Sequence, residues 1–386
     1  MAEQRITHLL NWRVMKILFQ TIGVLVQYNW ALPYYISRRG VKLVNLTNAM
    51  SYLMGGYHYH LKAPKSLIPF FLDTGIAHLS FKYVENIFPI ERFATNFDVI
   101  HLNSPNDSVT WKLLKVDVPK LFVLHGSLDI IDERKSKTAC KRLEEINSRV
   151  DAFVTASYHA AHTVKNFCGF KPIVIHHGVD ISIFNPFNVS REKAREKLSI
   201  PKDKKVIVWV GRIDPIKNLT MMINALPYVV REEKDVLLLV KGRAVERTYF
   251  QKILTSIKDL DLTKYVRLDI KWTANMSMIY YYRAADIYVH TSLSEAFGSL
   301  TMLEAMASGV PIIAYRRSSI PEALGDAGLL VESEQELAEK ILEVLYNNKV
   351  KAELSRKSYE RVLRNFRIEL TAEKYHRLYS DLSHGT

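Results

Sequence analysis

Residues 290–313 read HTSLSEAFGSLTMLEAMASGVPII, and they join a turn, a helix and the start of a strand. Apolar residues recur at helical spacing over 300–307, which predicts a short helix. Gly309 and Pro311 should end this helix, because glycine suits the left-handed position after a helix and proline cannot continue one. The apolar residues at 310–314 then predict a short buried strand.

Two glutamates, Glu295 and Glu304, flank the expected start of this helix. Carboxylates in such a place can accept the hydroxyl groups of a sugar or a ribose, and the free N–H groups of a helix start attract phosphate. A purely structural role is the alternative. Each glutamate also follows Ser292 or Thr301 at the capping-box spacing, in which an acid only satisfies backbone donors.

A second polar segment follows the apolar strand predicted at 205–210. It reads GRIDPIKN, with Arg212 and Lys217 five positions apart. A rigid guanidinium and a mobile ammonium at such a turn can bind a diphosphate from two sides. Taken alone the segment is weak evidence, since an exposed arginine and lysine are usually just solvated.

Together the two segments resemble the donor site of family 4 glycosyltransferases, retaining enzymes of GT-B fold. The family patterns are G-R-x-x-x-x-K and E-x-F-G followed by E-A-M-A-x-G-x-P. The matching positions are Gly211, Arg212, Lys217, Glu295, Phe297, Gly298, the run 304–307, Gly309 and Pro311.

The chain departs from the family in the spacing of its two glutamates. Eight residues, 296–303, separate them, where the family usually has seven. An extra residue in the loop before Thr301 leaves the direction of Glu304 unchanged, whereas one inside the helix turns Glu304 by roughly 100°. We expect the loop, with Thr301 as the helix cap.

The resemblance implies transfer of a sugar from a nucleoside diphosphate to an acceptor hydroxyl, with retention of configuration and with no cofactor. Arg212 and Lys217 would stabilise the departing diphosphate, a role in which preorganised donors usually contribute most. Glu295 would hold a sugar hydroxyl and Glu304 the ribose, while His125, followed by Gly126, would face the sugar. The implied catalytic residues are His125, Arg212, Lys217 and Glu295. The implied donor-binding residues are Gly23, Gly211, Arg212, Lys217, Phe297, Gly298, Ser299, Leu300, Thr301 and Glu304.

The order of expected elements indicates an α/β protein. A strand at 15–21, a helix to about residue 39 and a strand at 41–47 form the doubly wound pattern, and a second such series begins at 205. The resemblance implies the GT-B arrangement, in which two Rossmann-like doubly wound domains face each other across a cleft and a C-terminal helix crosses back to the first domain. The expected domains are 1–185 for the acceptor, 186–365 for the nucleotide sugar and 366–386 for the crossing helix.

Composition limits the partners and the compartment. The 53 lysines and arginines exceed the 40 acidic residues by 13, but they are spread over both halves, so no nucleic-acid-binding tail is expected. Cys140 and Cys168 are the two cysteines, and they suggest a reducing compartment without a disulfide or a zinc site. The apolar run 14–36 is too interrupted to span a bilayer. We therefore expect a cytoplasmic protein, free or peripheral on the inner membrane face.

No metal site is expected. The segment Asp259-Leu-Asp261 reads as a helix end rather than a metal-binding D-x-D. Three histidine pairs lack carboxylate partners at ligand spacing. They are His58 with His60, His159 with His162, and His176 with His177.

Two other functions remain open at this stage. An epimerase of nucleotide sugars on the same fold would need a general acid–base set that the sequence does not display. A basic, non-catalytic protein that binds nucleic acid or anionic membrane would show weak, salt-dependent binding and no turnover. Among acceptors for a transferase, the sequence leaves open a glycan, a lipid-linked molecule and a small molecule.

Overall fold

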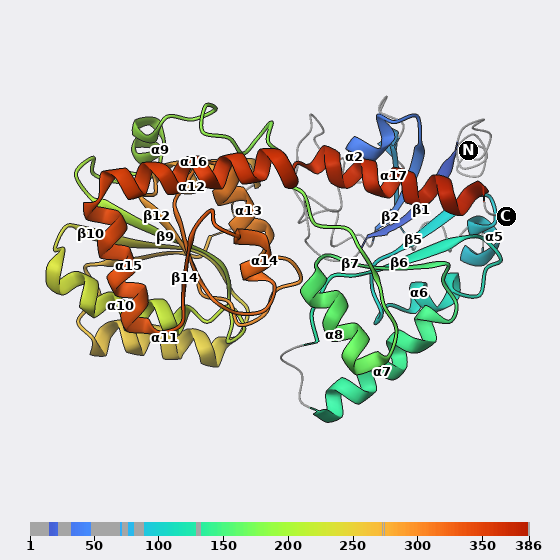
Figure 1. The fold of residues 1–386 in the computed structure, drawn as a ribbon, viewed down its shortest axis with the longest axis horizontal. Coiled ribbons are helices and arrows are strands. Elements are labelled where there is room, and N and C mark those ends of the chain that lie inside the picture. The colour runs from blue at the N-terminus through green and yellow to red at the C-terminus, as the bar shows by residue number, and fades with distance from the viewer. Residues whose placement is uncertain are drawn as a thin grey trace. The chain divides into compact units, whose positions relative to one another are not determined.

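The computed structural model describes residues 15–21, 32–47, 70–71, 76–80, 89–128, 133–271, 273 and 275–384. The chain divides into two compact units. The first runs up to His177 and takes in the end of the chain from Ile368, and the second is Gly178–Arg367. The sequence placed these divisions after residues 185 and 365. Each unit contains its own sheet, as Figure 1 shows.

The sheet of the first unit is parallel except at one edge. Its strand order is β3-β4-β2-β1-β5-β6-β7-β8. The short β3 pairs antiparallel with β4, and neither strand was predicted from the sequence. The strands are β1 Lys16–Thr21, β2 Lys42–Thr47, β3 Phe70–Phe71, β4 Ile76–Ser80, β5 Val99–Leu102, β6 Lys120–Leu124, β7 Ala152–Thr155 and β8 Ile173–Val174.

Helices cover both faces of this sheet, because alternate strand residues point to opposite sides. Ile17 and Phe19 of β1 share a core with the two helices on one face, α2 and α17. Leu18 belongs to the core on the other face, which includes residues of α5, α6, α7 and α8. The helices are α2 Leu32–Ser37, α5 Ile90–Ala94, α6 Ser108–Leu113, α7 Glu133–Asn147, α8 Tyr158–Cys168 and α17 Ile368–His384.

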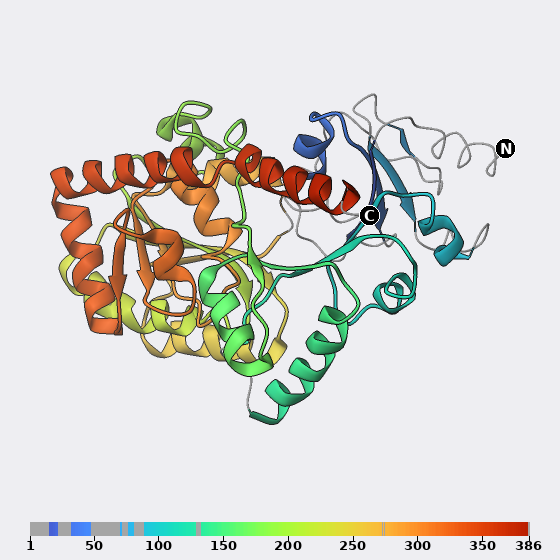
Figure 2. The same ribbon diagram turned by 45° about the vertical axis from the view of Figure 1, so that its right-hand side comes forward.

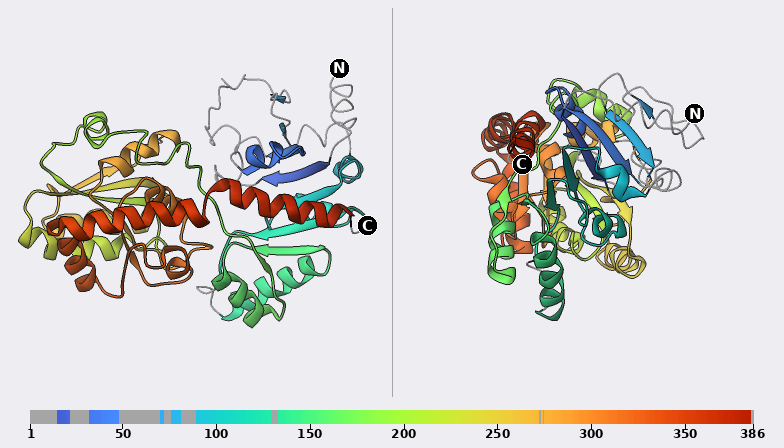
Figure 3. Two further views of the ribbon diagram at one scale, coloured as in Figure 1. Left: turned by 45° about the horizontal axis from the view of Figure 1, so that its top comes forward. Right: turned by 90° about the vertical axis from the view of Figure 1, so that its right-hand side faces the viewer.

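The last helix, α17, belongs to the first unit although it ends the chain. Ile368, Ala372, Tyr375 and Tyr379 are buried at helical spacing in the core that contains β1. Figures 1 and 3 show α17 beside α2 and this sheet. The prediction of a C-terminal helix that returns to the first part of the chain is therefore confirmed.

The two cysteines correct the sequence interpretation. Cys140 on α7 and Cys168 at the end of α8 form a disulfide, with their Cα atoms 5.0 Å apart. The helices pack against each other, as Figure 2 shows, so residues far apart in sequence become neighbours. The expectation of no disulfide was wrong. Since disulfides are typical of oxidising compartments, the cysteines give no support to a reducing one.

The second unit has a six-stranded sheet, parallel at every described pair, with strand order β11-β10-β9-β12-β13-β14. The strands are β9 Lys205–Ile213, β10 Val236–Ala244, β11 Val266–Asp269, β12 Ile287–His290, β13 Ile312–Tyr315 and β14 Leu329–Val331. The helices are α9 Arg191–Lys197, α10 Leu219–Glu232, α11 Arg247–Asp259, α12 Met278–Ala284, α13 Leu300–Ala307, α14 Ile320–Leu324, α15 Glu334–Tyr346 and α16 Asn348–Asn365, with the 3₁₀ helix η2 Asn275–Ser277.

One strand is longer than the sequence indicated. The prediction ended β9 at Val210 and put Gly211 and Arg212 in a turn. In the structure β9 continues to Ile213, because it pairs with β10 as far as Ala244. Arg212 therefore sits on the rigid end of a strand.

The buried carboxylate of Asp286 connects the amino ends of β9 and β12 to the helices α9 and α16 through ion pairs and a backbone hydrogen bond. Asp286, 1% exposed, pairs with Arg195 at 2.9 Å and also with Arg191 and Lys351. It accepts the backbone N–H of Val206 at 2.8 Å as well. Burial opposes ionisation, but Lys351 and Arg191 outweigh it and lower the pKa of Asp286. This side chain is a structural centre of the second unit.

Among the helices in the described part of the chain, none is both long enough and apolar enough to cross a membrane.

Candidate active site

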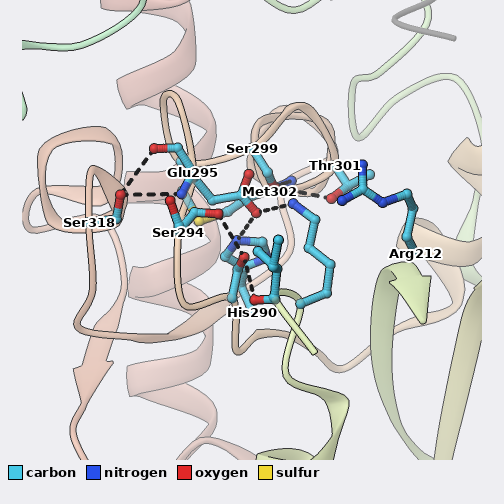
Figure 4. A network of polar contacts seen from close by, with 12 residues as sticks. Arg212, His290, Ser294, Glu295, Ser299, Thr301, Met302 and Ser318 are labelled. Carbon is cyan, nitrogen blue, oxygen red and sulfur yellow. Dashed lines mark hydrogen bonds and ion pairs between the residues drawn. The ribbon is translucent and has the colours of Figure 1, made fainter. Parts of the chain in front are cut away.

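The candidate site lies where the strand order of the second sheet reverses. β9 and β12 are neighbours in the sheet, while the chain between them runs out through β10 and β11. Open parallel sheets bind ligands beyond the carboxyl ends of the strands at such a switch point. Arg212 is the last residue but one of β9, His290 is the last residue of β12, and the loop after His290 leads into α13. Figure 4 shows these groups together.

Glu295 is the centre of the polar network in Figure 4. Its Oε1 lies 2.5 Å from Nζ of Lys217 and 3.2 Å from Nε2 of His290, and its side chain is 9% exposed. Burial disfavours the ionised carboxyl, but Lys217 and then His290 favour it more strongly, and they lower the pKa of Glu295 to about 2. A buried carboxylate is therefore held in its charged form at neutral pH.

Two serines fix the loop that carries Glu295. Ser318 Oγ donates to the carbonyl of Glu295 at 3.1 Å, and Ser319 Oγ donates to the same oxygen at 2.9 Å. Ser319 Oγ also accepts the N–H of Gly298 at 3.0 Å. Gly298 has φ +56°, and a Cβ there would meet that of Ala323 at 2.6 Å, so glycine is required. No sequence motif pointed to either serine, since both lie more than twenty positions from Glu295.

The start of α13 differs from the expected one. Ser299 is the N-cap, and its Oγ accepts the N–H of Met302 at 3.1 Å. Thr301, predicted to be the cap, lies inside the helix and contacts the hydroxyl of Tyr288 at 3.0 Å. The cap prediction was therefore wrong. In the loop before the helix, Gly298 and Ser299 both have positive φ, and the placing of the extra residue in this loop stays a prediction.

Glu304 is buried in the second unit. It is 3% exposed, and its Oε2 accepts the hydroxyl of Tyr282 on α12 at 2.6 Å. Phe297 is buried too, with its ring 5.0 Å from that of Phe366. Contact between residue 297 and a ligand would therefore involve its backbone. Leu300, also expected to bind the donor, is the first residue of α13.

Asp214 contacts both residues of the second motif, Arg212 through its side chain and Lys217 through its backbone. Nε of Arg212 is 2.7 Å from Asp214 Oδ2, and the backbone N–H of Lys217 donates to Asp214 Oδ1 at 3.0 Å. The Arg212 side chain is 55% exposed, and in Figure 4 it extends toward Thr301. Arg212 is also in register with exposed Arg243 on β10. The sequence missed Arg243, because no recognised pattern includes it.

His125 belongs to the first unit and follows β6. Its Nε2 lies 2.7 Å from Oδ1 of Asn103, and its ring centroid is 5.6 Å from that of His177. Burial, followed by the nearby His177 and His101, lowers the pKa of His125 well below its usual value. His125 is therefore a neutral imidazole at physiological pH. Gly23, another expected donor-binding residue, lies outside the described residues.

Within the described ranges, no three His, Cys, Asp or Glu side chains are grouped so that they could hold a metal ion. The helix α11 ends at Asp259, which confirms that the segment 259–261 is a helix end. His58 and His60 fall outside the described part of the chain.

Each unit matches its own family model. Residues 190–361 match the model of glycosyl transferases group 1, and residues 31–183 match that of glycosyltransferase family 4. The two sheets and the returning α17 are those of the GT-B fold. The chain belongs to the glycosyl transferase group 1 family, as its two motifs indicated.

Curated relatives match over part of their length. A D-inositol 3-phosphate glycosyltransferase of Corynebacterium efficiens is 29% identical over 221 residues, which are 54% of this chain and 50% of the relative. An alpha-monoglucosyldiacylglycerol synthase of Streptococcus pneumoniae is 31% identical over 215 residues, or 54% of this chain and 46% of the relative. The chain thus spans about half the length of the curated relatives it matches.

Solved structures share the fold over nearly the whole chain. Sucrose-phosphate synthase from Thermosynechococcus elongatus aligns with a TM-score of 0.76 at 18% identity, covering 96% of this chain and all of that one. Anabaena Alr3699/HepE, solved with UDP and glucose, aligns with a TM-score of 0.76 at 19% identity, covering 95% of this chain and all of that one. At these identities the likeness shows the fold alone.

Proposed function

We propose that this protein transfers a sugar from a nucleoside-diphosphate sugar to an acceptor hydroxyl and retains the anomeric configuration. The observation that carries the proposal is the buried Lys217–Glu295 pair beside the start of α13, in a unit that matches the glycosyl transferase model. Lys217 offers a cation that can bind phosphate, and Glu295 offers an ionised carboxylate that can accept a sugar hydroxyl; the two side chains are in direct contact. This pair suits a ligand that carries both a phosphate and a sugar.

The difficult step is the departure of the diphosphate, which gains negative charge as the bond to the sugar lengthens. Arg212 and Lys217 supply positive charge, and the first N–H groups of α13 add backbone donors. Groups that are already in place lower the barrier most, because they need no reorganisation during the reaction. The leaving phosphate can take the proton of the acceptor hydroxyl, so no further base is required.

Lys217 would have two partners during turnover. Without a donor its ammonium is 2.5 Å from Glu295. A bound diphosphate would compete for the same ammonium, whereas His290 remains beside Oε1 of Glu295 at 3.2 Å. The histidine would keep the carboxylate in place while Lys217 turns toward phosphate.

Donor and acceptor classes are suggested by charge and by the relatives. The HepE structure contains UDP and glucose, so a UDP-sugar is the first donor to test. The named activities of the two curated relatives involve an inositol phosphate and a glucosylated diacylglycerol. The net charge of +13 favours an anionic acceptor, such as a phosphorylated small molecule or an anionic lipid. With a lipid acceptor the protein would act at the cytoplasmic membrane surface.

A thermal-shift screen tests the proposed function. The full chain is heated with UDP-, GDP- and ADP-sugars, each at several concentrations. A ligand present at 100 times its Kd stabilises the folded state by about 2.7 kcal/mol, so the true donor should raise the melting temperature in a concentration-dependent way. The absence of a shift with every donor, together with salt-sensitive binding to nucleic acid or anionic vesicles, would instead favour a non-catalytic protein.

Glu304→Gln should weaken binding of the nucleotide. A ribose hydroxyl that donates to a carboxylate forms a charge-assisted bond worth about 1.5–3 kcal/mol. Its loss should raise the Kd of the nucleoside diphosphate about 10- to 100-fold in a calorimetric titration. Glu343→Gln, at an exposed position of α15, is the matched control and should leave the Kd unchanged. Equal affinity of the two variants for the nucleotide would show that Glu304 contacts Tyr282 and does not bind the ribose.

A further inference from the structure

Two arginines stand side by side at the edge of the second unit's sheet where the strands end. Arg212 on β9 and Arg243 on β10 are paired in the register of these parallel strands, and each is the last residue but one of its strand. Neighbouring strands lie about 4.8 Å apart, and residues paired in a parallel sheet point to the same face. Both guanidinium groups can therefore reach the same small anion.

The face from which they project is the one that carries α13. Trp209 of β9 and Val240 of β10 belong to the apolar core on the opposite face. Side chains alternate along a strand, so Arg212 and Arg243 point away from that core. Figure 4 shows Arg212 extending toward Thr301 in the first turn of α13. The paired arginines and the start of this helix thus lie on one face of the sheet.

A buried lysine fixes the end of β10 from which Arg243 projects. Nζ of Lys241 lies 3.0 Å from Oδ1 of Asp269 on β11 and 5.2 Å from the ring centroid of Tyr281 on α12. The Tyr281 hydroxyl donates to the same carboxylate. Lys241 precedes Arg243 by two residues, so this cluster holds the backbone directly before the arginine. Arg243, like Arg212, is mounted on a rigid strand end.

The positive charge of this pair is only partly compensated. Nε of Arg212 is 2.7 Å from Asp214. Arg243 is exposed, and none of the described carboxylates forms an ion pair with it. Like charges paired on adjacent strands are destabilising, so the stability of the sheet does not explain an arginine at this position. A phosphate beside both groups would remove the repulsion, because arginine binds phosphate oxygens through parallel N–H groups.

The order of the strands gives the order of the cations along the edge of the sheet. Lys217 contacts Glu295, the residue assigned to the sugar, in the loop that follows β12. Arg212 is on β9, the neighbour of β12, and Arg243 is on β10, on the other side of β9. The three cations therefore run from the sugar end of the site toward β10. A diphosphate along this row presents its sugar-side phosphate to Lys217.

We propose that Arg243 is a further donor-binding residue, which binds the phosphate next to the nucleoside beside Arg212. The proposal rests on the proposed function. It assigns the two phosphates to different cations, with Lys217 at the phosphate that carries the sugar and Arg243 at the one that carries the nucleoside. Removing Arg243 should therefore weaken every ligand that contains the second phosphate, whether or not it contains the first.

Calorimetric titrations of the full chain with UDP, GDP and ADP, and with UMP, GMP and AMP, test this assignment. Arg243→Gln keeps a polar side chain and removes the charge. It should raise the Kd of the nucleoside diphosphate that binds by about 10-fold, the effect of losing one charge-assisted contact. The Kd of the corresponding monophosphate should rise by a similar factor. Lys217→Ala should instead raise the Kd of the diphosphate more than that of the monophosphate.

Two further variants serve as controls. Arg231→Gln removes an exposed arginine from the last turn of α10, which leads to the amino end of β10, and should leave both Kd values unchanged. Arg243→Lys restores the charge without the planar guanidinium and should recover part of the affinity that Arg243→Gln loses. Circular dichroism shows that each variant is folded, as expected for an exposed position.

Unchanged affinity of Arg243→Gln for both nucleotides would overturn the inference, and so would an equal loss in Arg231→Gln. A loss confined to the diphosphate would move Arg243 to the sugar-side phosphate and contradict the assignment. If Arg243→Lys binds no better than Arg243→Gln, the contact does not depend on charge and the inference fails. Nucleotide binding that depends on Arg243 without any sugar transfer would count against the proposed function alone. A wild type that binds none of the six nucleotides would overturn both.

Discussion

Lys217→Ala and Arg212→Ala should each lower kcat/KM for sugar transfer by about 10²–10³-fold, the cost of removing one preorganised donor to a developing charge. Lys217 should show the larger loss, because its removal also leaves Glu295 buried with only His290 beside Oε1. Steady-state kinetics with the donor found by thermal shift measure the effect. Circular dichroism confirms that each variant is folded.

Matched controls separate a site effect from a general loss of positive charge. Arg356 on α16 resembles Arg212, since its side chain is 59% exposed and it pairs with an acid. Lys340 on α15 also pairs with an exposed acid. Arg356→Ala and Lys340→Ala should retain wild-type kinetics. Equal activity in all four variants would remove the diphosphate assignment.

Asp286→Ala should destabilise the second unit by about 3–5 kcal/mol, the range for removing one partner of a buried ion pair. The substitution leaves Arg195, whose side chain is 3% exposed, without its carboxylate. It also deprives the N–H of Val206 of its acceptor. Urea unfolding followed by circular dichroism should show a midpoint at a clearly lower urea concentration.

Asp235→Ala is the control for this stability measurement. Asp235 pairs with Lys204 at 3.1 Å, but its side chain is 66% exposed. An exposed pair contributes about 0–1 kcal/mol, so the unfolding midpoint should barely move. If the two variants unfold at the same urea concentration, the Asp286 cluster has no special structural role.

Much of the fold could be predicted because its signals are local. Apolar runs bounded by glycine and polar residues predicted strands at 15–21 and 41–47, and β1 and β2 each begin one residue later and end at the predicted residue. The last helix was expected at 366–386, and α17 occupies Ile368–His384. β4 and β14 were missed, and β3 has only two residues, too few to produce a pattern.

The candidate site was predicted in part for the same reason. Arg212, Lys217 and Glu295 belong to short motifs, and the structure brings Lys217 and Glu295 into contact. Ser319 and Asn103 belong to none, and each reaches its partner across the fold from another part of the sequence. The disulfide was missed because its two helices meet only in three dimensions.

Arg212 and Lys217 are proposed to bind the diphosphate of a sugar donor. A calorimetric titration of UDP, GDP and ADP into the wild-type protein and the double variant Arg212→Ala/Lys217→Ala tests this assignment. One nucleotide should bind the wild type, and its Kd should rise by at least about 100-fold in the variant, since each charge-assisted contact is worth about 1.5–3 kcal/mol. Equal affinity for the two proteins, with the variant folded, would show that these two side chains do not bind the diphosphate.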